Sequence, residues 1–533
     1  MEKVMKRRIG ILLLAALSTV ACNFLDTYPQ DVKTVADSFD TEDDVLEALS
    51  GVYCTLGASQ LYGNNMLGRM GLSADIGYEY YGSDANTVGY YEVVASDAKI
   101  NSYWRYFYQG IGNANRLLEN MDKAPLDDAT RARVRSEAVF LRAYYHFMLT
   151  VRFGSIPYVT RVPASGNISD MQLPQTPQAD IYQAIIADMD TAVAGLPDAS
   201  ALTGGGRLSK SAAWGILARV CLNAAGYPCY LPGMYAKAKE YAKKVMDTGF
   251  HALNPSYEQV FINYMQDIYD LRESIWEVEF YGNNTGTYTT TAGMVGRNNG
   301  ISFSNSDGNH DEIGVSIGTI RTSSYFYDLF EEKDLRRDWT IAPYTYSSSG
   351  EKVLQTTNIW IRFCGKFRRE YETLKPKSVS YTPTNFPLLR YADVLLMYAE
   401  GVACDENASS EEVTAAYECL NQIRRRGYGK DTSVPDASVD VPVEGRAALL
   451  ETLKDERARE LGFELLRKDD IVRWGEFYRR MKFVGSLIPS AYTSSYYVAG
   501  RQYYGNVGSR DVLWPIPSYE LGVNRNLVQN PGW

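Results

Sequence analysis

Residues that could perform catalysis are few in this chain. His146, His251 and His310 are its only histidines, and none lies in an HExxH motif or in another paired spacing that binds metals. The chain has no glycine-rich phosphate loop and no GxSxG nucleophile elbow, because GVSIG (314–318) has the spacing but lies in a segment without helical periodicity. His146, within LRAYYHFML, is expected to pack inside a helix rather than to bind a metal. The sequence therefore predicts no catalytic residues, no metal site and no cofactor.

One segment concentrates charges at regular spacing: DERARELGFELLRKDDIVRWG, residues 455–475. Spacings of four, four, three, three and three residues separate Glu456, Glu460, Glu464, Arg467, Asp470 and Arg473. Such spacing predicts one face of one helix. That face could be a charged catalytic groove, or it could clamp the helix to its neighbours through partly buried ion pairs. We favour the second interpretation.

Tyrosine is unusually abundant, with 41 residues. Many tyrosines gather in segments rich in Gly, Asn and Ser, together with Phe303: Tyr78, Tyr80, Tyr81, Tyr90 and Tyr91; Tyr281 and Tyr288; Tyr344 and Tyr346; and Tyr492, Tyr496, Tyr497, Tyr503 and Tyr504. Aromatic rings offer a flat apolar face, and nearby Asn, Asp and Arg can bond hydroxyls or amides. These groups suit sugar rings or extended peptides, although for any single tyrosine the expected role is packing.

The N-terminus predicts export and a lipid anchor at Cys22. A basic start precedes a twelve-residue apolar run (9–20) that ends in Thr-Val-Ala-Cys, as in the signal of a bacterial lipoprotein. The run is shorter than the roughly 20 residues that span a bilayer. Lipidation would make Cys22 the attachment point, since two or three acyl chains hold a protein stably. The alternative is ordinary secretion, with Cys22 removed or disulfide-bonded.

Six further cysteines, at 54, 221, 229, 364, 404 and 419, show no C-x-x-C motif. We expect most of them to be small buried hydrophobic residues. Cys221 and Cys229 are the nearest pair, and the sequence leaves open whether they are bridged.

Composition and charge exclude several classes of protein. The chain is 45% hydrophobic and 22% charged, as expected for a folded protein with a sizeable core. Its net charge is −10, and the first 21 residues contribute +3, so the remainder carries −13. No block of Lys and Arg follows residue 8. Binding to nucleic acid is therefore not expected, since that affinity rests on neutralising phosphates.

Helical periodicity predicts a mostly α-helical scaffold. Amphipathic helices are expected at 41–56, which opens on a Thr cap, and at 101–122, 127–152 and 178–195. Two helix pairs follow, 209–224 with 234–247 and 390–403 with 410–425, and they resemble degenerate tetratricopeptide packing. Segments 76–93, 281–324, 340–384 and 490–508 lack a helical period and predict long irregular insertions that share one surface.

Several segments in order resemble the SusD/RagB family of outer-membrane lipoproteins. They are RSEAVFLRAYYHFMLTVRFGSIPYV (135–159), GRLSKSAAWGILARVCLNAAG (206–226), NFPLLRYADVLLMYAE (385–400), ERARELGFELLRKDDIVRWG (456–475) and LWPIPSYELGVNRNLVQNPGW (513–533). NFLDTYPQD after Cys22 is similar to the family's mature start. Leu465 departs from the pattern, because the family often has Gly there, and so does Trp533, where Tyr is common.

The resemblance implies a SusD-like helical fold with tetratricopeptide-like pairs and long loops rich in Tyr, Asn and Gly. It implies residues 1–21 as signal peptide, 22–40 as a lipid-anchored tether, and 41–265 and 266–533 as N- and C-terminal parts of one packed unit. It also implies a cell-surface protein of the outer membrane that captures a glycan and covers a SusC-like TonB-dependent transporter as its lid.

The ligand residues of such proteins lie in variable loops, so no motif transfers them. We predict stacking by Tyr80, Tyr81, Tyr90, Tyr288 and Phe303, with Asp84, Asn86 and Arg297 as polar partners. A peptide-binding lid is an alternative, since Asn-, Ser- and Thr-rich loops could bond an extended backbone equally well. A glycoside hydrolase with two carboxylates is a remote alternative.

Overall fold

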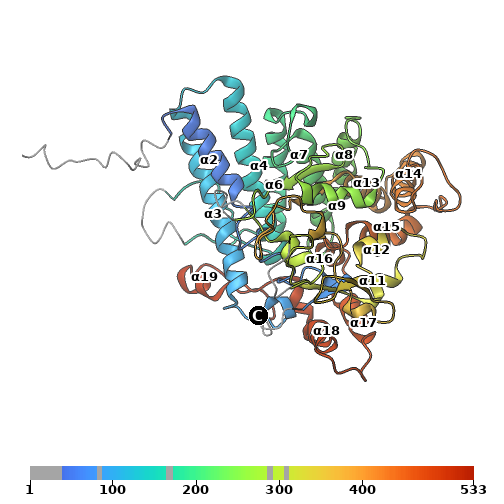
Figure 1. Ribbon diagram of the computed structural model, residues 1–533. Helices are drawn as coiled ribbons and strands as arrows, with labels where there is room; N and C mark the ends of the chain where they lie inside the picture. The colour runs from blue at the N-terminus through green and yellow to red at the C-terminus, as the bar shows by residue number, and fades with distance from the viewer. Residues whose placement is uncertain (1–38, 81–86, 164–171, 285–291, 305–310) are drawn as a thin grey trace, which may run out of the picture.

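The computed structural model (Figure 1) describes residues 39–80, 87–163, 172–284, 292–304 and 311–533. Helices dominate this part of the chain, as predicted. The longer ones are α2 (Glu42–Cys54), α3 (Ala98–Asn120), α4 (Asp128–Phe153), α6 (Gln178–Ala192), α7 (Lys210–Ala225), α8 (Met234–Met246), α9 (Tyr257–Gln266), α13 (Tyr391–Cys404), α14 (Ser410–Gly427), α15 (Arg446–Leu461), α17 (Phe477–Ser486) and α18 (Ser495–Asn506). Shorter ones are α10 (Val295–Asn299), α11 (Ser324–Asp328), α12 (Arg336–Thr340), α16 (Arg467–Arg473) and α19 (Ser518–Val523).

The described chain contains short antiparallel strand pairs, of which two join distant segments and one is a local hairpin. The pairs are β1 (Gly77–Glu79) with β3 (Ile320–Thr322), β2 (Ser274–Val278) with β6 (Phe386–Arg390), and β4 (Tyr344–Tyr346) with β5 (Lys352–Leu354). The second pair joins the segment after α9 to the segment before α13, while the first brings an N-terminal loop to the middle of the chain.

The N-terminal helices begin and end where their sequence predicts. Thr41 caps α2: its hydroxyl accepts from the Asp44 amide at 3.2 Å, and the Asp44 carboxylate accepts from the Thr41 amide at 3.0 Å. α3 and α4 run side by side along one edge of the molecule (Figure 1). α4 ends at Gly154, whose positive φ of 71° suits glycine.

The two predicted helix pairs form one stack. α8 packs against both α7 and α13, and α14 extends the row beyond α13 (Figure 1). Close approach depends on Gly401 of α13, because a Cβ there would lie 2.8 Å from the Lys239 amide nitrogen of α8. Tetratricopeptide-like packing of neighbouring helices is therefore present, with a glycine where α13 meets α8.

The charged segment 455–475 is not one helix, so that prediction is wrong. α15 ends at Leu461 and α16 begins at Arg467, and the turn between them contains Phe463 and Leu465 with φ values of 66° and 65°. A left-handed residue cannot continue a right-handed helix, which explains the break. Leu465 is the position where we expected glycine from the family pattern.

The interpretation of this segment as an ionic clamp is confirmed, and the pairs are buried rather than partly buried. Arg390 at the end of β6 donates to Glu464 (2.8 Å), Glu273 (2.8 Å) and Glu460 (3.1 Å). Arg426 at the end of α14 lies 2.6 Å from Glu460. Each of these side chains is no more than 4% exposed. The network therefore ties α14, α15, β2 and β6 together in the interior.

The expectation that 490–508 is irregular is also wrong, because α18 occupies most of that segment. Its buried side includes Tyr497, Tyr503 and Tyr504. The spacing is helical, but the apolar face is built from tyrosine rather than from aliphatic residues.

One large hydrophobic cluster runs from Phe39 to Leu527 and includes residues from both predicted parts of the chain. A second cluster joins the loop before β1 to Trp360, α16, α17 and α18. Within the described residues, no helix is long and apolar enough to cross a bilayer.

Candidate ligand-binding surface

An extended segment, 316–322, brings the predicted insertions to one place. Ser316 pairs with Phe303, and the Ile317 amide donates to the Arg297 carbonyl at 2.9 Å. Further along, the Thr319 carbonyl accepts from the Tyr80 amide at 2.7 Å. Tyr80, next to the end of β1, and the backbone around α10 are therefore neighbours along this segment, which is consistent with the predicted shared surface.

A group of tyrosines lies where this segment meets α18. The Tyr80 hydroxyl is 2.7 Å from the Ser495 hydroxyl, and Asn358 donates to the Tyr496 hydroxyl at 3.2 Å. Tyr492 stacks on Tyr497 with ring centroids 4.8 Å apart and planes 12° apart. We call Tyr80, Asn358, Tyr492, Ser495 and Tyr496 the tyrosine platform.

The platform presents flat aromatic surface to solvent on a rigid base. Tyr492 is 52% exposed, whereas Tyr497 beneath it is 6% exposed. Burial raises the pKa of Tyr497, so its hydroxyl stays neutral at any physiological pH. A ring held by stacking from below keeps its outer face free and loses little entropy when a ligand covers it.

The predicted site residues have different outcomes. Tyr80 is half-buried and belongs to the platform. Tyr90 and Phe303 are each 4% exposed, so in this conformation they pack the interior rather than offer a face to a ligand. Arg297 is half-buried, and its Nε donates to the Val379 carbonyl at 3.3 Å. The remaining predictions lie outside the described residues: Cys22, Tyr81, Asp84, Asn86 and Tyr288.

Sequence reasoning missed part of this surface. Tyr492 and Tyr496 were visible as a tyrosine-rich stretch but could not be assigned to the site, because α18 had not been predicted. Asn358 and Arg321 carried no signal. The Arg321 guanidinium carbon lies 3.6 Å from the Phe363 ring centroid and 5.3 Å from that of Tyr80. Only the fold brings these residues beside the platform.

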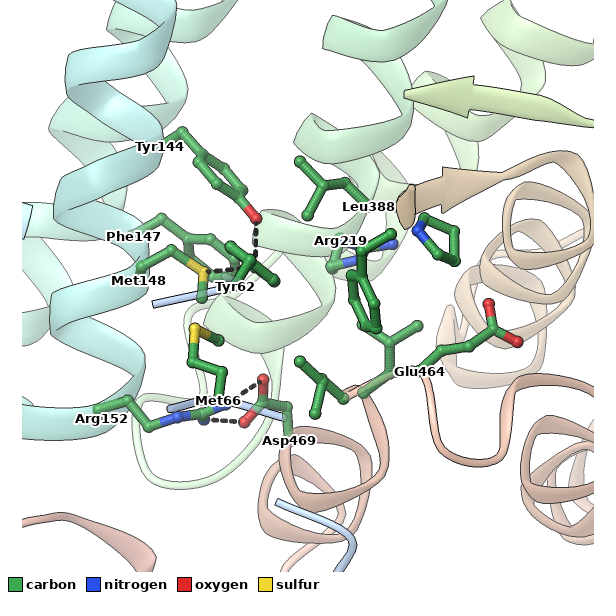
Figure 2. Close-up of a pocket in the computed structure, with 14 residues that line it drawn as sticks. Tyr62, Met66, Tyr144, Phe147, Met148, Arg152, Arg219, Leu388, Glu464 and Asp469 are labelled. Carbon is green, nitrogen blue, oxygen red and sulfur yellow. Dashed lines mark hydrogen bonds and ion pairs between the residues drawn. The ribbon is translucent and has the colours of Figure 1, made fainter. Parts of the chain in front are cut away.

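An interior cavity of about 20 Å³ lies between α4, α7, β6 and the turn before α16 (Figure 2). It is lined by Tyr62, Tyr144 and the ion pair of Arg152 with Asp469, and the hydroxyls of Tyr62 and Tyr144 lie 3.1 Å apart. This volume holds about one water molecule. The cavity is therefore part of the packed scaffold and is too small for a sugar or peptide.

A second hollow of about 260 Å³ lies between α2 and the end of β2. Glu277 lines it, and burial raises the pKa of this carboxyl to about 7. Its Oε2 accepts from Asn385 at 3.0 Å, whereas its Oε1 has no hydrogen-bond partner. Exposed aromatic faces do not line this cleft, so it suits stacking of sugar rings less well than the platform does.

His146 packs inside a helix as predicted, whereas the prediction for the cysteines holds only in part: Cys221, Cys364 and Cys419 are buried, Cys229 and Cys404 are half-buried and Cys54 is exposed. His146 is fully buried, with Nδ1 2.9 Å from the Arg142 carbonyl and Nε2 accepting from the Val159 amide at 3.0 Å. Burial lowers its pKa to about 3, so it is neutral. Cys221 and Cys229 are both free. Among the residues described, no group of three or more His, Cys, Asp or Glu could hold a metal ion.

Comparison with known proteins identifies the family. The sequence model of the SusD family matches residues 272–533. A second family model, described as starch-binding associating with outer membrane, matches residues 23–222. The chain belongs to the SusD/RagB family. The family is thus assigned over most of the chain, on both sides of the segment that precedes β2.

Individual relatives resemble the chain over most of its length. SusD-like protein P2 of Formosa agariphila is 26% identical over 563 residues, which cover 99% of this chain and 100% of that protein. The starch-binding protein SusD of Bacteroides thetaiotaomicron is 24% identical over 451 residues, covering 76% and 74%.

Solved structures agree on the fold. A SusD homolog from Bacteroides thetaiotaomicron superposes with a TM-score of 0.85 at 24% identity, covering 94% of this chain and 98% of that one. A laminarin-binding SusD-like protein gives a TM-score of 0.71 at 22% identity, covering 93% and 100%. These likenesses show that the SusD fold is shared.

Proposed function

We propose that the protein is a lipoprotein of the outer membrane that captures oligo- or polysaccharide at the cell surface and delivers it to a SusC-like TonB-dependent transporter. Membership of the SusD/RagB family supports this proposal, as do relatives whose names describe starch and laminarin binding. The observation that carries it is the tyrosine platform, an exposed flat aromatic surface held on packed strands and helices.

Binding on the platform needs no covalent step. A pyranose ring would cover the outer face of Tyr492, and its hydroxyls would bond to Asn358, Ser495 and the rim of Tyr80. Each of these contacts is individually weak. Release to a transporter requires modest affinity, which a few stacking contacts at a solvent-exposed surface would provide.

Affinity electrophoresis in gels that contain laminarin, starch or other glycans tests the proposal. We expect Tyr80→Ala and Tyr492→Ala each to weaken retention about tenfold, because stacking and lost buried area together amount to about 1.5 kcal/mol. Tyr519→Ala is the matched control: this tyrosine is 66% exposed, and α19 lies apart from α18 (Figure 1). Unchanged retention of every binding glycan in the two platform variants would refute the site.

The same preparation distinguishes the alternatives. Retention of peptides but of no glycan would favour a peptide-binding lid. Release of reducing sugar from a bound glycan would instead reveal a glycoside hydrolase.

Anchor and partner need separate experiments. The proposal places lipid on Cys22, so Cys22→Ala should lose incorporation of labelled palmitate and release the protein from the outer membrane. A TonB-dependent barrel should copurify with the wild-type protein from detergent-solubilised outer membranes. Palmitate incorporation that survives Cys22→Ala would contradict the anchor, and repeated purification without any barrel would contradict the role as a lid.

A further inference from the structure

Arg321 stands beside the tyrosine platform, and no carboxylate of the described residues balances its charge. Its Nη1 donates to the Ile361 carbonyl, and its Nε is buried without a hydrogen-bond partner among those residues. Within the described part of the chain, no carboxylate oxygen lies within 4.0 Å of this guanidinium. Several interior arginines behave differently, since Arg336, Arg390 and Arg473 all contact carboxylates. Arg368, which is also buried, instead donates to the carbonyls of Gly365, Asp338 and Trp339.

The position of the guanidinium is fixed by two rings. Phe363 and Tyr80 lie against it, with centroids 3.6 Å and 5.3 Å from Cζ. Guanidinium groups stack well on aromatic rings, which leaves their edge free to bond oxygens. Burial lowers the pKa of Arg321, which reflects the free energy lost when its charge leaves water without a compensating anion.

Two segments near the platform are rich in cations in an otherwise acidic protein. Residues 352–369 and 477–510 each contain five Lys or Arg and no Asp or Glu. Six of these ten cations contact carboxylates: Lys352, Arg362, Lys366, Arg369, Arg479 and Arg480. Arg501 of α18 contacts no carboxylate among the described residues and donates to the carbonyls of Pro489 (3.1 Å) and Tyr492 (2.8 Å). Arg321 therefore lies against the Tyr80 ring and Arg501 bonds the backbone of Tyr492, each without a carboxylate partner in the part of the chain that the structure describes.

We infer that the platform selects anionic glycans, and that Arg321 pairs with a carboxylate or sulfate group of a sugar that stacks on the platform. This inference rests on the proposed glycan-binding function. A ligand anion would supply the counter-charge that the fold leaves out, and an arginine edge matches the two oxygens of a carboxylate. Since the whole chain is acidic, such a ligand gains its affinity from this local pairing rather than from long-range attraction.

The test compares glycans that differ only in charge. Polygalacturonate and its carboxyl-reduced form, together with chondroitin sulfate and its desulfated form, are titrated calorimetrically against the wild-type protein. We expect at least one acidic polymer to bind about 10- to 100-fold more tightly than its matched derivative, as for a charge-assisted hydrogen bond. The affinity for this acidic polymer should decrease when the NaCl concentration is raised from about 50 mM to about 500 mM.

Variants assign the preference to one residue. Arg321→Gln should abolish the preference for the acidic polymer, Arg321→Lys should keep part of it, and Arg131→Gln, far away at the start of α4, should change nothing. Melting temperatures close to that of the wild type would show that each variant is folded. A preference that survives Arg321→Gln would overturn the inference.

The outcomes also separate this inference from the proposed function. If neutral polymers bind through Tyr492 with the same affinity as acidic polymers, the inference of an anionic preference fails but the proposed glycan binding stands. If no polymer of either kind binds, both fail.

Discussion

Replacing Arg390 should test whether the buried ionic network stabilises the scaffold. Arg390 is 1% exposed and contacts three carboxylates, those of Glu273, Glu460 and Glu464. Each of these carboxylates keeps at least one other cation: Arg426 for Glu273, Arg426 and Arg336 for Glu460, and Lys366 for Glu464. Arg390→Met would therefore leave the carboxylates under-compensated rather than wholly unpaired.

Removing one partner from a buried ionic cluster costs about 3 to 5 kcal/mol. For a chain of about 500 ordered residues, the entropy of unfolding is about 1 kcal/mol/K, since each residue contributes roughly 2.1 cal/mol/K. The expected fall in melting temperature is thus only about 3 to 5 °C. Urea unfolding gives a more direct measure, because the midpoint reports the free energy of unfolding when the slope is unchanged.

Two further variants make the result interpretable. Arg131→Met removes an exposed ion pair with Asp122 and should cost less than about 1 kcal/mol. Arg390→Lys keeps the charge but loses the fork of donors, so its loss should be intermediate. If Arg390→Met were no less stable than Arg131→Met, the network would be neutral to stability and the reasoning would be refuted.

Three more predictions follow from single positions. Burial lowers the pKa of His146 to about 3 in the folded state from an ordinary 6.5, so the unfolded chain binds the proton first as the pH falls. The wild-type protein therefore loses stability as pH falls below about 6.5. Between pH 7 and pH 4.5, the free energy of unfolding of His146→Gln, measured by urea titration, should fall by about 2 to 3 kcal/mol less than that of the wild type. Leu465→Gly should be more stable than Leu465→Ala by about 1 kcal/mol, because both lose the same buried side chain but only glycine relieves the positive φ; the reverse order in calorimetry would contradict this. Cys54 is exposed and free, so it should react with a thiol reagent in the native protein while the buried Cys221 should not, and equal rates would contradict this difference in exposure.

Aliphatic periodicity predicted the helices that build the scaffold. α2, α4 and α7 lie close to their expected bounds, because each combines a polar cap with an apolar face at helical spacing. α18 was missed for the opposite reason: its buried side consists of tyrosines, which also occur in loops. The break at Phe463 and Leu465 could not be predicted either, since neither residue type favours a left-handed conformation.

The candidate site was predicted less completely than the fold. Tyr80 lies half-buried at the surface of the first insertion, whereas Tyr90, ten residues away, is buried in the second cluster. A tyrosine that packs and one that binds have the same composition around them, so sequence cannot separate them. Arg321 and Asn358 come from other segments, and only the pairing of β1 with β3 and the packing of α18 bring them to the platform.

The roles of the motifs that identified the family explain why the sequence does not identify the ligand. Their charged residues pair with one another across the sequence: Arg219 with Asp393 (2.6 Å), Arg457 with the same aspartate (2.8 Å), and Arg473 with Glu400 (2.7 Å). Because losing either partner would leave a buried charge uncompensated, these residues depend on one another and on the fold. Every residue of the platform lies outside those motifs. The ligand class must therefore be inferred from the platform's own chemistry, in which aromatic faces stand beside a guanidinium that no described carboxylate contacts.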